Sequence, residues 1–246
     1  MPKFFVERDQ ISDKTIRIYG DDAKHIAYSL RMAKGEHITV CDKMTREYDC
    51  VLVAFESECV TAEILEERET PGEPPLKISL YQGLPKGDKL ETVIQKAVEC
   101  GVLDITPFES ERCVAKAKAD SEERKTERRN RIAVEAAKQC GRGIVPTVNA
   151  TVSFDEAVRR AMHADIAFIC YEDEEKTTIK QILTEAKKRA ISSVSIMIGS
   201  EGGFSSDEVN RAKSCGMRPA SLGKRILRTE TAPVFVLSCL SYEFEL

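Results

Sequence analysis

Two short, continuously apolar segments constrain the fold more than any other feature of this sequence. They cover residues 165–171 and 194–199. A strand that is buried on both faces of a parallel sheet has this composition, because neither face needs polar residues. A further strand is expected at residues 76–81, and helical segments alternate with all three. The sequence therefore predicts an α/β fold, with helices on both faces of a parallel sheet.

The segments that connect these strands have helical patterns. Apolar residues at positions 90, 93, 94, 97 and 98 share one face of a helix, which Gly101 ends. A short strand is expected at 105–108, and a long charged helix at about 121–140. The last helix starts near Ala232 and is apolar nearly all round, so we expect it to be buried in the fold or in a subunit interface.

The first 70 residues follow another pattern, with short β-branched segments separated by turns. Strands are expected at residues 15–19, 37–41, 48–53 and 59–65, with one helix at about 22–32. Short strands at this spacing suggest a small barrel. Residues 70–75 contain two adjacent prolines, which cannot continue a helix or a central strand, so this segment is expected to be a linker. The sequence thus predicts two domains, residues 1–72 and 73–246.

Composition narrows the possible functions. The net charge of −4 disfavours a general nucleic-acid coat, yet residues 112–142 hold ten Lys and Arg against five Asp and Glu, enough for phosphate contacts on one face. The nine cysteines are scattered and form no Cys-x-x-Cys motif, which disfavours a metal site. Since no segment approaches the roughly 20 apolar residues of a membrane helix, we expect a cytoplasmic protein with no membrane partner and no metal.

The strongest local signal is a glycine-rich segment, residues 198–208, which follows the second buried strand. It has three glycines within five residues, and Ser205 and Glu208 then have the spacing of a helix capping box. Ligands of open α/β sheets bind beyond the carboxyl ends of strands, where glycines let the backbone approach them closely. A tight turn with nothing bound is the alternative. The spacing fits neither a dinucleotide-binding motif nor a P-loop, so a dehydrogenase or NTPase is disfavoured.

A second candidate segment, residues 221–232, directly precedes the last helix. It combines Gly223, two adjacent aliphatic residues and the basic residue Arg228. It is either an ordinary basic loop that caps a helix, or an apolar slot for a flat base in which Arg228 holds an anion. The residues alone leave both interpretations open.

The two segments together resemble the knotted loops of SPOUT methyltransferases. The resemblance lies in residues 198–203 and 222–232. Similarity to the bacterial 16S rRNA uracil-N3 methyltransferases extends over residues 84–89, 94–97, 101–102, 110–113 and 135–142, and over Arg31, Met32 and Gly35. These matches span nearly the whole chain. Ser200 and Lys224 depart from the pattern, because the family usually has proline at both positions.

The resemblance implies a fold and a reaction. It implies a PUA-like β-barrel followed by a SPOUT domain with a deep trefoil knot, and a homodimer. The cofactor would be S-adenosylmethionine (SAM), and the substrate 16S rRNA or the small ribosomal subunit, methylated at N3 of a uridine. Three alternatives stay open: an RNA-binding assembly factor with weak or lost activity, a SPOUT methyltransferase for another RNA or for a ribose oxygen, and a nucleotide-binding metabolic enzyme.

The resemblance also implies which residues form the site. The cofactor-binding residues would be Met197, Gly199, Glu201, Gly202, Gly203, Leu222, Gly223, Ile226, Leu227 and Arg228. Arg112, Gln139 and Arg142 would hold the RNA, and the basic helix residues Arg124, Lys125, Arg128, Arg129 and Arg131 would add salt-sensitive affinity. Uracil N3 must lose its proton before it can attack, so a cation has to stabilise the resulting anion. Lys96 and Arg228 are the candidate catalytic residues.

Overall fold

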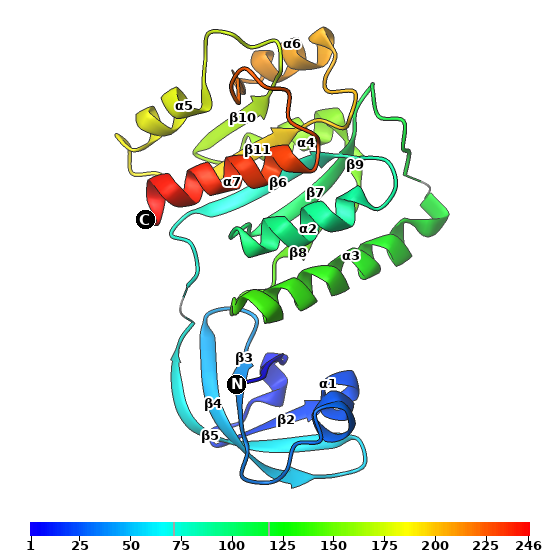
Figure 1. The fold of residues 1–246 in the computed structure, drawn as a ribbon, viewed down its shortest axis with the longest axis vertical. Helices are drawn as coiled ribbons and strands as arrows, with labels where there is room; N and C mark the ends of the chain where they lie inside the picture. Colours follow the sequence, from blue (N-terminus) through cyan, green and yellow to red (C-terminus); the bar gives the residue numbers. More distant parts are fainter. Residues whose placement is uncertain (71, 118) are drawn as a thin grey trace. The chain divides into compact units, whose positions relative to one another are not determined.

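The chain, described by a computed structural model for residues 1–70, 72–117 and 119–246, divides into two compact units (Figure 1). The first unit comprises Met1–Glu73 and Ala137–Val145. The second comprises Pro74–Ala136 and Pro146–Leu246. The second unit therefore contains both segments that the sequence analysis selected as candidate site.

The first unit is built on a curled sheet with the strand order β1-β3-β4-β5-β2. Its strands are β1 (Lys3–Phe5), β2 (Thr15–Tyr19), β3 (His37–Cys41), β4 (Arg46–Phe55) and β5 (Cys59–Glu69). Its short helices are η1 (Arg8–Gln10), α1 (Gly20–Lys24) and η2 (His25–Ser29). Apolar side chains such as Phe4, Ile16 and Leu52 fill the core of this unit. The four strands predicted from the sequence are all present.

Two features of this unit differ from the prediction. Strands β4 and β5 are longer than expected, and their pairing shifts register between Asp49 and Cys50 and between Leu52 and Ala54, as β-bulges do in bent strands. The helix expected at 22–32 is shorter and irregular, since its second half is a single π-helical segment that ends at Ser29. Arg31 then has a φ of 53°, which a right-handed helix cannot continue.

The second unit is an α/β layer structure around a sheet with the order β12-β10-β11-β6-β7-β8, in which β9 also pairs with β7. Every described pairing in this sheet is parallel. Its strands are β6 (Lys77–Gly83), β7 (Asp104–Glu109), β8 (Thr147–Val148), β9 (Val152–Ser153), β10 (Ile166–Cys170), β11 (Ser193–Ile198) and β12 (Arg218–Ala220). Its helices are α2 (Lys89–Glu99), α3 (Ala119–Cys140), α4 (Phe154–Ala161), α5 (Ile179–Ala186), α6 (Ser206–Ser214) and α7 (Thr231–Phe244). The predicted parallel α/β fold is confirmed.

The register of this sheet brings three strand ends together. Met197 of β11 pairs with Tyr81 of β6 on one side and with Ile169 of β10 on the other. The carboxyl ends of β6, β10 and β11 therefore meet at one edge of the sheet, where open α/β folds bind their ligands. The trefoil knot itself stays a prediction from the resemblance.

The last helix, α7, packs against α2 and α5. It buries one face, which includes Ala232, Val236, Leu237 and Leu240. Phe235 on another face is only half-buried, and Tyr242 is exposed. The helix predicted to be apolar nearly all round is thus buried in the fold on one face and leaves apolar side chains accessible on the others.

Candidate cofactor and RNA site

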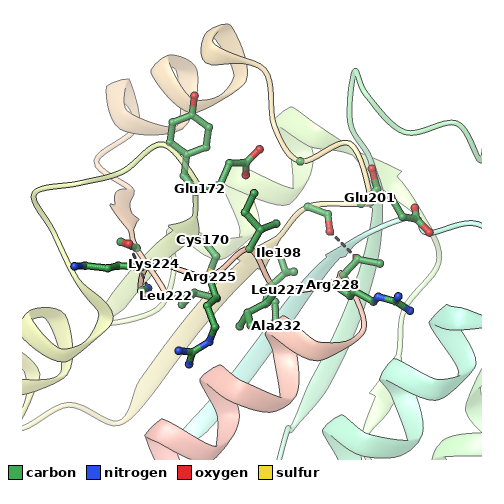
Figure 2. A pocket seen from close by; sticks show the side chains of 18 of the residues that line it. Cys170, Glu172, Ile198, Glu201, Leu222, Lys224, Arg225, Leu227, Arg228 and Ala232 are labelled. Carbon is green, nitrogen blue, oxygen red and sulfur yellow. Dashed lines mark hydrogen bonds between the residues drawn. The ribbon is translucent and has the colours of Figure 1, made fainter.

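A cavity of about 410 Å³ lies at the carboxyl ends of β10 and β11. Such a volume falls in the roughly 300–1,000 Å³ range of small-molecule sites. Three segments line it: the residues after β10, the glycine-rich segment after β11, and the segment that leads into α7. The lining residues are Lys89, Cys170, Tyr171, Glu172, Ile198, Gly199, Ser200, Glu201, Gly203, Ser221, Leu222, Gly223, Lys224, Arg225, Ile226, Leu227, Arg228, Thr229 and Ala232. Figure 2 shows Ile198 and Leu227 in the middle of this cavity.

The glycine-rich segment is packed too tightly to accept side chains. A Cβ atom on Gly83, at the end of β6, would lie 2.6 Å from the backbone nitrogen of Ser200, and one on Gly199 would lie 3.0 Å from the Cα of Gly203. Gly203 has a φ of +64°, in the left-handed region that favours glycine. The predicted capping box follows: Ser205 accepts a hydrogen bond from the Glu208 N–H, and the Glu208 side chain accepts one from the Ser205 N–H.

A buried hydrogen-bond network, which the sequence analysis did not predict, holds this segment in place. Gln82 of β6 is fully buried, and its Nε2 donates to Thr229 Oγ1 at 2.9 Å and to the Gly199 carbonyl at 3.3 Å. Thr229 Oγ1 donates to the same carbonyl at 2.7 Å. Three segments that are distant in sequence are therefore fixed to one another directly behind the cavity.

At the edge of the cavity, Lys89 joins α2 to the glycine-rich segment and to the segment that leads into α7. Its Nζ lies 2.9 Å from Glu201 Oε1 and 3.6 Å from Glu230 Oε2. The backbone N–H of Lys86 also donates to the Glu201 carboxylate. Burial opposes ionisation of Glu201, but the hydrogen bonds from Lys89 and Lys86 outweigh it and hold the pKa of this carboxyl below its ordinary value. The hydrogen bond to Glu201 likewise raises the pKa of Lys89, so both groups are charged at neutral pH.

Most of the residues predicted to bind the cofactor line this cavity. They are Gly199, Glu201, Gly203, Leu222, Gly223, Ile226, Leu227 and Arg228. Met197 does not line it, because its side chain is fully buried in the apolar core beside β11. Gly202 also lies outside, and a Cβ on it would come within 2.9 Å of the Cβ of Arg112.

The two candidate cations lie in different surroundings. Arg228 is exposed and is one of the lining residues, and Figure 2 shows its side chain at the edge of the cavity, pointing away from Ile198. Lys96 lies on α2 outside the lining, with its Nζ 2.9 Å from Glu99 Oε1. Two lysines line the cavity, Lys89 and Lys224, and the sequence did not single out Lys89 as a site residue.

The predicted RNA-binding residues are divided between the two units. Arg112 belongs to the second unit, and its Nη1 donates to the Gly202 carbonyl at 3.2 Å, so it adjoins the glycine-rich segment. Gln139 and Arg142 belong to the first unit. Gln139 is exposed, whereas Arg142 is buried, with its Nη2 2.7 Å from Glu73 Oε2.

The basic face of α3 is smaller than expected. Its exposed members are Arg124, Lys125, Arg128 and Arg131. Arg129 instead points inward and is buried, and its Nη1 lies 2.8 Å from Glu122 Oε1. The expectation that Arg129 belongs to the exposed face is therefore wrong, because this guanidinium neutralises a half-buried carboxylate.

Residues 1–70, 72–117 and 119–246 contain no group of three or more His, Cys, Asp or Glu side chains arranged to hold a metal. The same ranges contain no helix that is both long and apolar enough to span a membrane.

Comparisons with known proteins agree with this architecture. Residues 72–241 match the RNA methyltransferase domain family, and residues 18–65 match the RNA methyltransferase PUA domain. The chain therefore combines a PUA domain with an RNA methyltransferase domain.

Individual relatives specify the family further. The ribosomal RNA small subunit methyltransferase E of Bacillus subtilis is 36% identical over all of this chain and 98% of its own length. That of Synechocystis is 30% identical over 96% of this chain and 76% of its own. A crystal structure of the Neisseria gonorrhoeae enzyme of the same name, bound to S-adenosyl methionine, has a TM-score of 0.86 and 30% identity, and the match covers 98% of this chain and 97% of that one. This chain belongs to the ribosomal RNA small subunit methyltransferase E family.

Proposed function

We propose that this protein transfers the methyl group of SAM to N3 of a uridine in the 16S rRNA of the small ribosomal subunit. The observation that carries the proposal is the cavity, in which glycine backbone, apolar side chains and Arg228 converge at the carboxyl ends of parallel strands. Family membership supports the choice of reaction, and the N3 position rests on the resemblance of the sequence motifs. The rRNA substrate implies that the protein acts in the cytoplasm.

The residues of the cavity suit SAM. Ile198, Leu222 and Leu227 offer apolar surface to a flat base, and the glycine-rich segment offers backbone groups that no side chain covers. Gly199, Glu201, Gly203, Gly223 and Ile226 complete the proposed cofactor-binding set. Met197 and Gly202 would contribute indirectly, by fixing the conformation of the glycine-rich segment that lines the cavity. Bound SAM supplies an electrophilic methyl carbon on a sulfonium.

Arg228 is the residue we propose for stabilising the uracil anion. A neutral imide nitrogen is a poor nucleophile, and an arginine beside the base would favour loss of its proton by stabilising the charge on the ring oxygens. A guanidinium stays protonated at all relevant pH values, so it serves as a cation and not as the base. Lys96 is a second candidate only if the RNA extends from the cavity to α2.

The RNA is proposed to reach this cavity through contacts with basic residues of the second unit. Arg112 adjoins the glycine-rich segment, and the exposed residues Arg124, Lys125, Arg128 and Arg131 would add phosphate contacts that salt weakens. Gln139 and Arg142, in the first unit, are proposed as further contacts with the RNA. Arg142 would act indirectly, because its ion pair with Glu73 orients the segment in which it lies.

We also propose a homodimer in which the apolar side chains that α7 leaves accessible form part of the interface.

The test is methyl transfer from radiolabelled SAM to small ribosomal subunits that lack the modification, with the modified base mapped in the product. The wild type should label one uridine at N3. Arg228→Ala should lower turnover roughly 100-fold, the scale seen when one stabilising donor is removed, with SAM affinity changed far less. Arg189→Ala removes an exposed arginine outside the cavity and should leave turnover unchanged.

Each contrary outcome identifies what is wrong. Unchanged turnover in Arg228→Ala, with a loss in Lys96→Ala, would move the catalytic cation to α2. A ribose-methylated product would assign the other SPOUT chemistry. If the wild type binds RNA but not SAM, the chain is an RNA-binding assembly factor, and Ser200 and Lys224 are the first positions to revert to proline.

A further inference from the structure

The carboxylate of Glu172 lies against the glycine-rich segment. Glu172 follows β10 by two residues and lines the cavity. A Cβ on Gly203 would lie 2.4 Å from Glu172 Oε1 and 2.9 Å from Oε2, so the carboxylate occupies the space that the missing side chain leaves free. Gly203 is thus required both by its positive φ and by the position of Glu172. The carboxylate and the glycine backbone together form one side of the cavity.

Glu172 differs from the other acidic residue that lines this cavity. Glu201 is neutralised by Lys89 and accepts the Lys86 N–H. Within the described residues, Glu172 has neither a hydrogen-bond donor nor a counter-ion. The basic side chains that line the cavity do not supply one; Figure 2 shows Arg225 on the opposite side of Ile198 from Glu172. Glu172 is exposed to solvent, so a ligand that fills the cavity would displace water from its carboxylate and replace that water with hydrogen-bond donors of its own.

We propose that Glu172 accepts hydrogen bonds from the two ribose hydroxyls of the bound cofactor. This inference rests on the proposed function, since it assigns one side chain to one part of SAM. Two adjacent hydroxyls match the two oxygens of one carboxylate. The location agrees too: in nucleotide-binding α/β folds, an acidic residue that follows a strand binds the ribose of a ligand held by the glycine-rich turn of another strand. The cationic groups of SAM are the competing partners for Glu172, and three ligands separate the possibilities.

The experiment is calorimetric titration of the wild type and of Glu172→Gln with SAM, S-adenosylhomocysteine and 5′-methylthioadenosine. All three contain adenine and ribose; only SAM has a sulfonium, and methylthioadenosine has no amino-acid part. Hydrogen bonds to a charged group are worth about 1.5–3 kcal/mol, so Glu172→Gln should bind every one of the three roughly 10- to 100-fold more weakly. Glu175→Gln, an exposed glutamate of the same loop outside the cavity, should bind all three like the wild type.

Other patterns overturn the inference. A loss confined to SAM would place Glu172 at the sulfonium, and a loss for SAM and S-adenosylhomocysteine but not for methylthioadenosine would place it at the amino group. Unchanged affinities, with the wild type still binding SAM, would remove Glu172 alone and leave the proposed function standing. A wild type that binds no SAM would remove both. Equal thermal unfolding of the ligand-free variants excludes misfolding as the cause of any loss.

Discussion

The side of the cavity that we call the inner wall consists of Gly199, Ser200 and Thr229, with Gln82 and Gly83 directly behind them. All five residues are buried, and hydrogen bonds join Gln82, Gly199 and Thr229. The outer wall, residues 222–227, is half-buried to exposed, and the hydrogen bond described there, from the Gly223 N–H to Ser221 Oγ, is 3.3 Å long. A wall that is held in place can bind a cofactor with little loss of entropy. A wall with few contacts can move to admit a large substrate. The contrast indicates that the inner wall holds SAM in a fixed position, whereas the outer wall, which also contacts SAM, can move to admit the RNA.

The largest effect on SAM affinity is expected from Gly83→Val, because the new side chain would displace the backbone of the inner wall. The new Cβ would lie 2.6 Å from Ser200 N and 3.0 Å from the Gly199 carbonyl carbon, both backbone atoms that cannot rotate away. We expect SAM affinity to fall at least roughly 100-fold and the unfolding free energy to fall by about 1–3 kcal/mol. Calorimetry and denaturant unfolding measure both. Ala190→Val, on the surface, is the control; an equal loss in that variant would contradict the argument.

A smaller effect is expected from Gln82→Leu, which keeps the volume but removes the donors that join β6 to Thr229 and Gly199. Losing a buried hydrogen-bond partner costs about 1–3 kcal/mol, and SAM affinity should fall roughly 10-fold. Thr229→Val should resemble it, and the double variant should lose less than the sum of the two, because both residues belong to one network. Additive losses would show that Gln82 and Thr229 act independently.

The smallest effect is expected from Ile226→Ala in the outer wall. Ile226 is 88% exposed, so its truncation should change the unfolding free energy by less than about 0.5 kcal/mol. SAM affinity should stay within about two-fold of the wild type, since one exposed contact contributes little. KM for the ribosomal subunit is the sensitive measurement, and it should rise if the outer wall meets RNA. A large loss of SAM affinity would instead make this wall part of the fixed cofactor site.

The sequence predicted the sheet well because its signals are local. The apolar segments became β10 and β11, and the glycine-rich segment after β11 became one side of the cavity. The helix expected at 22–32 was longer than the one observed, since nothing in its apolar spacing reveals a backbone reversal at Arg31.

The missed site residues depend on contacts between distant segments. In the sequence, Gln82 is only a polar residue at the end of a strand. Its role follows from its hydrogen bond to Thr229, which lies 147 positions later in the chain. Lys89 and Lys96 both belong to the helix α2, and only the fold shows which of the two adjoins Glu201. For Arg129, a charge count could not show that Glu122 turns the side chain inward. Local patterns thus locate the cavity, whereas its charged partners follow from tertiary structure.

The thiol of Cys170 can be used to measure how often the cavity opens. It is the cysteine among the lining residues, and burial raises the pKa of its thiol, so at neutral pH it is protonated and unreactive while the surrounding side chains cover it. An alkylating reagent would reach this sulfur only during moments when the cover opens. The rate of Cys170 modification therefore measures how often the cavity opens in the free protein, and a bound ligand should slow that rate in proportion to its occupancy.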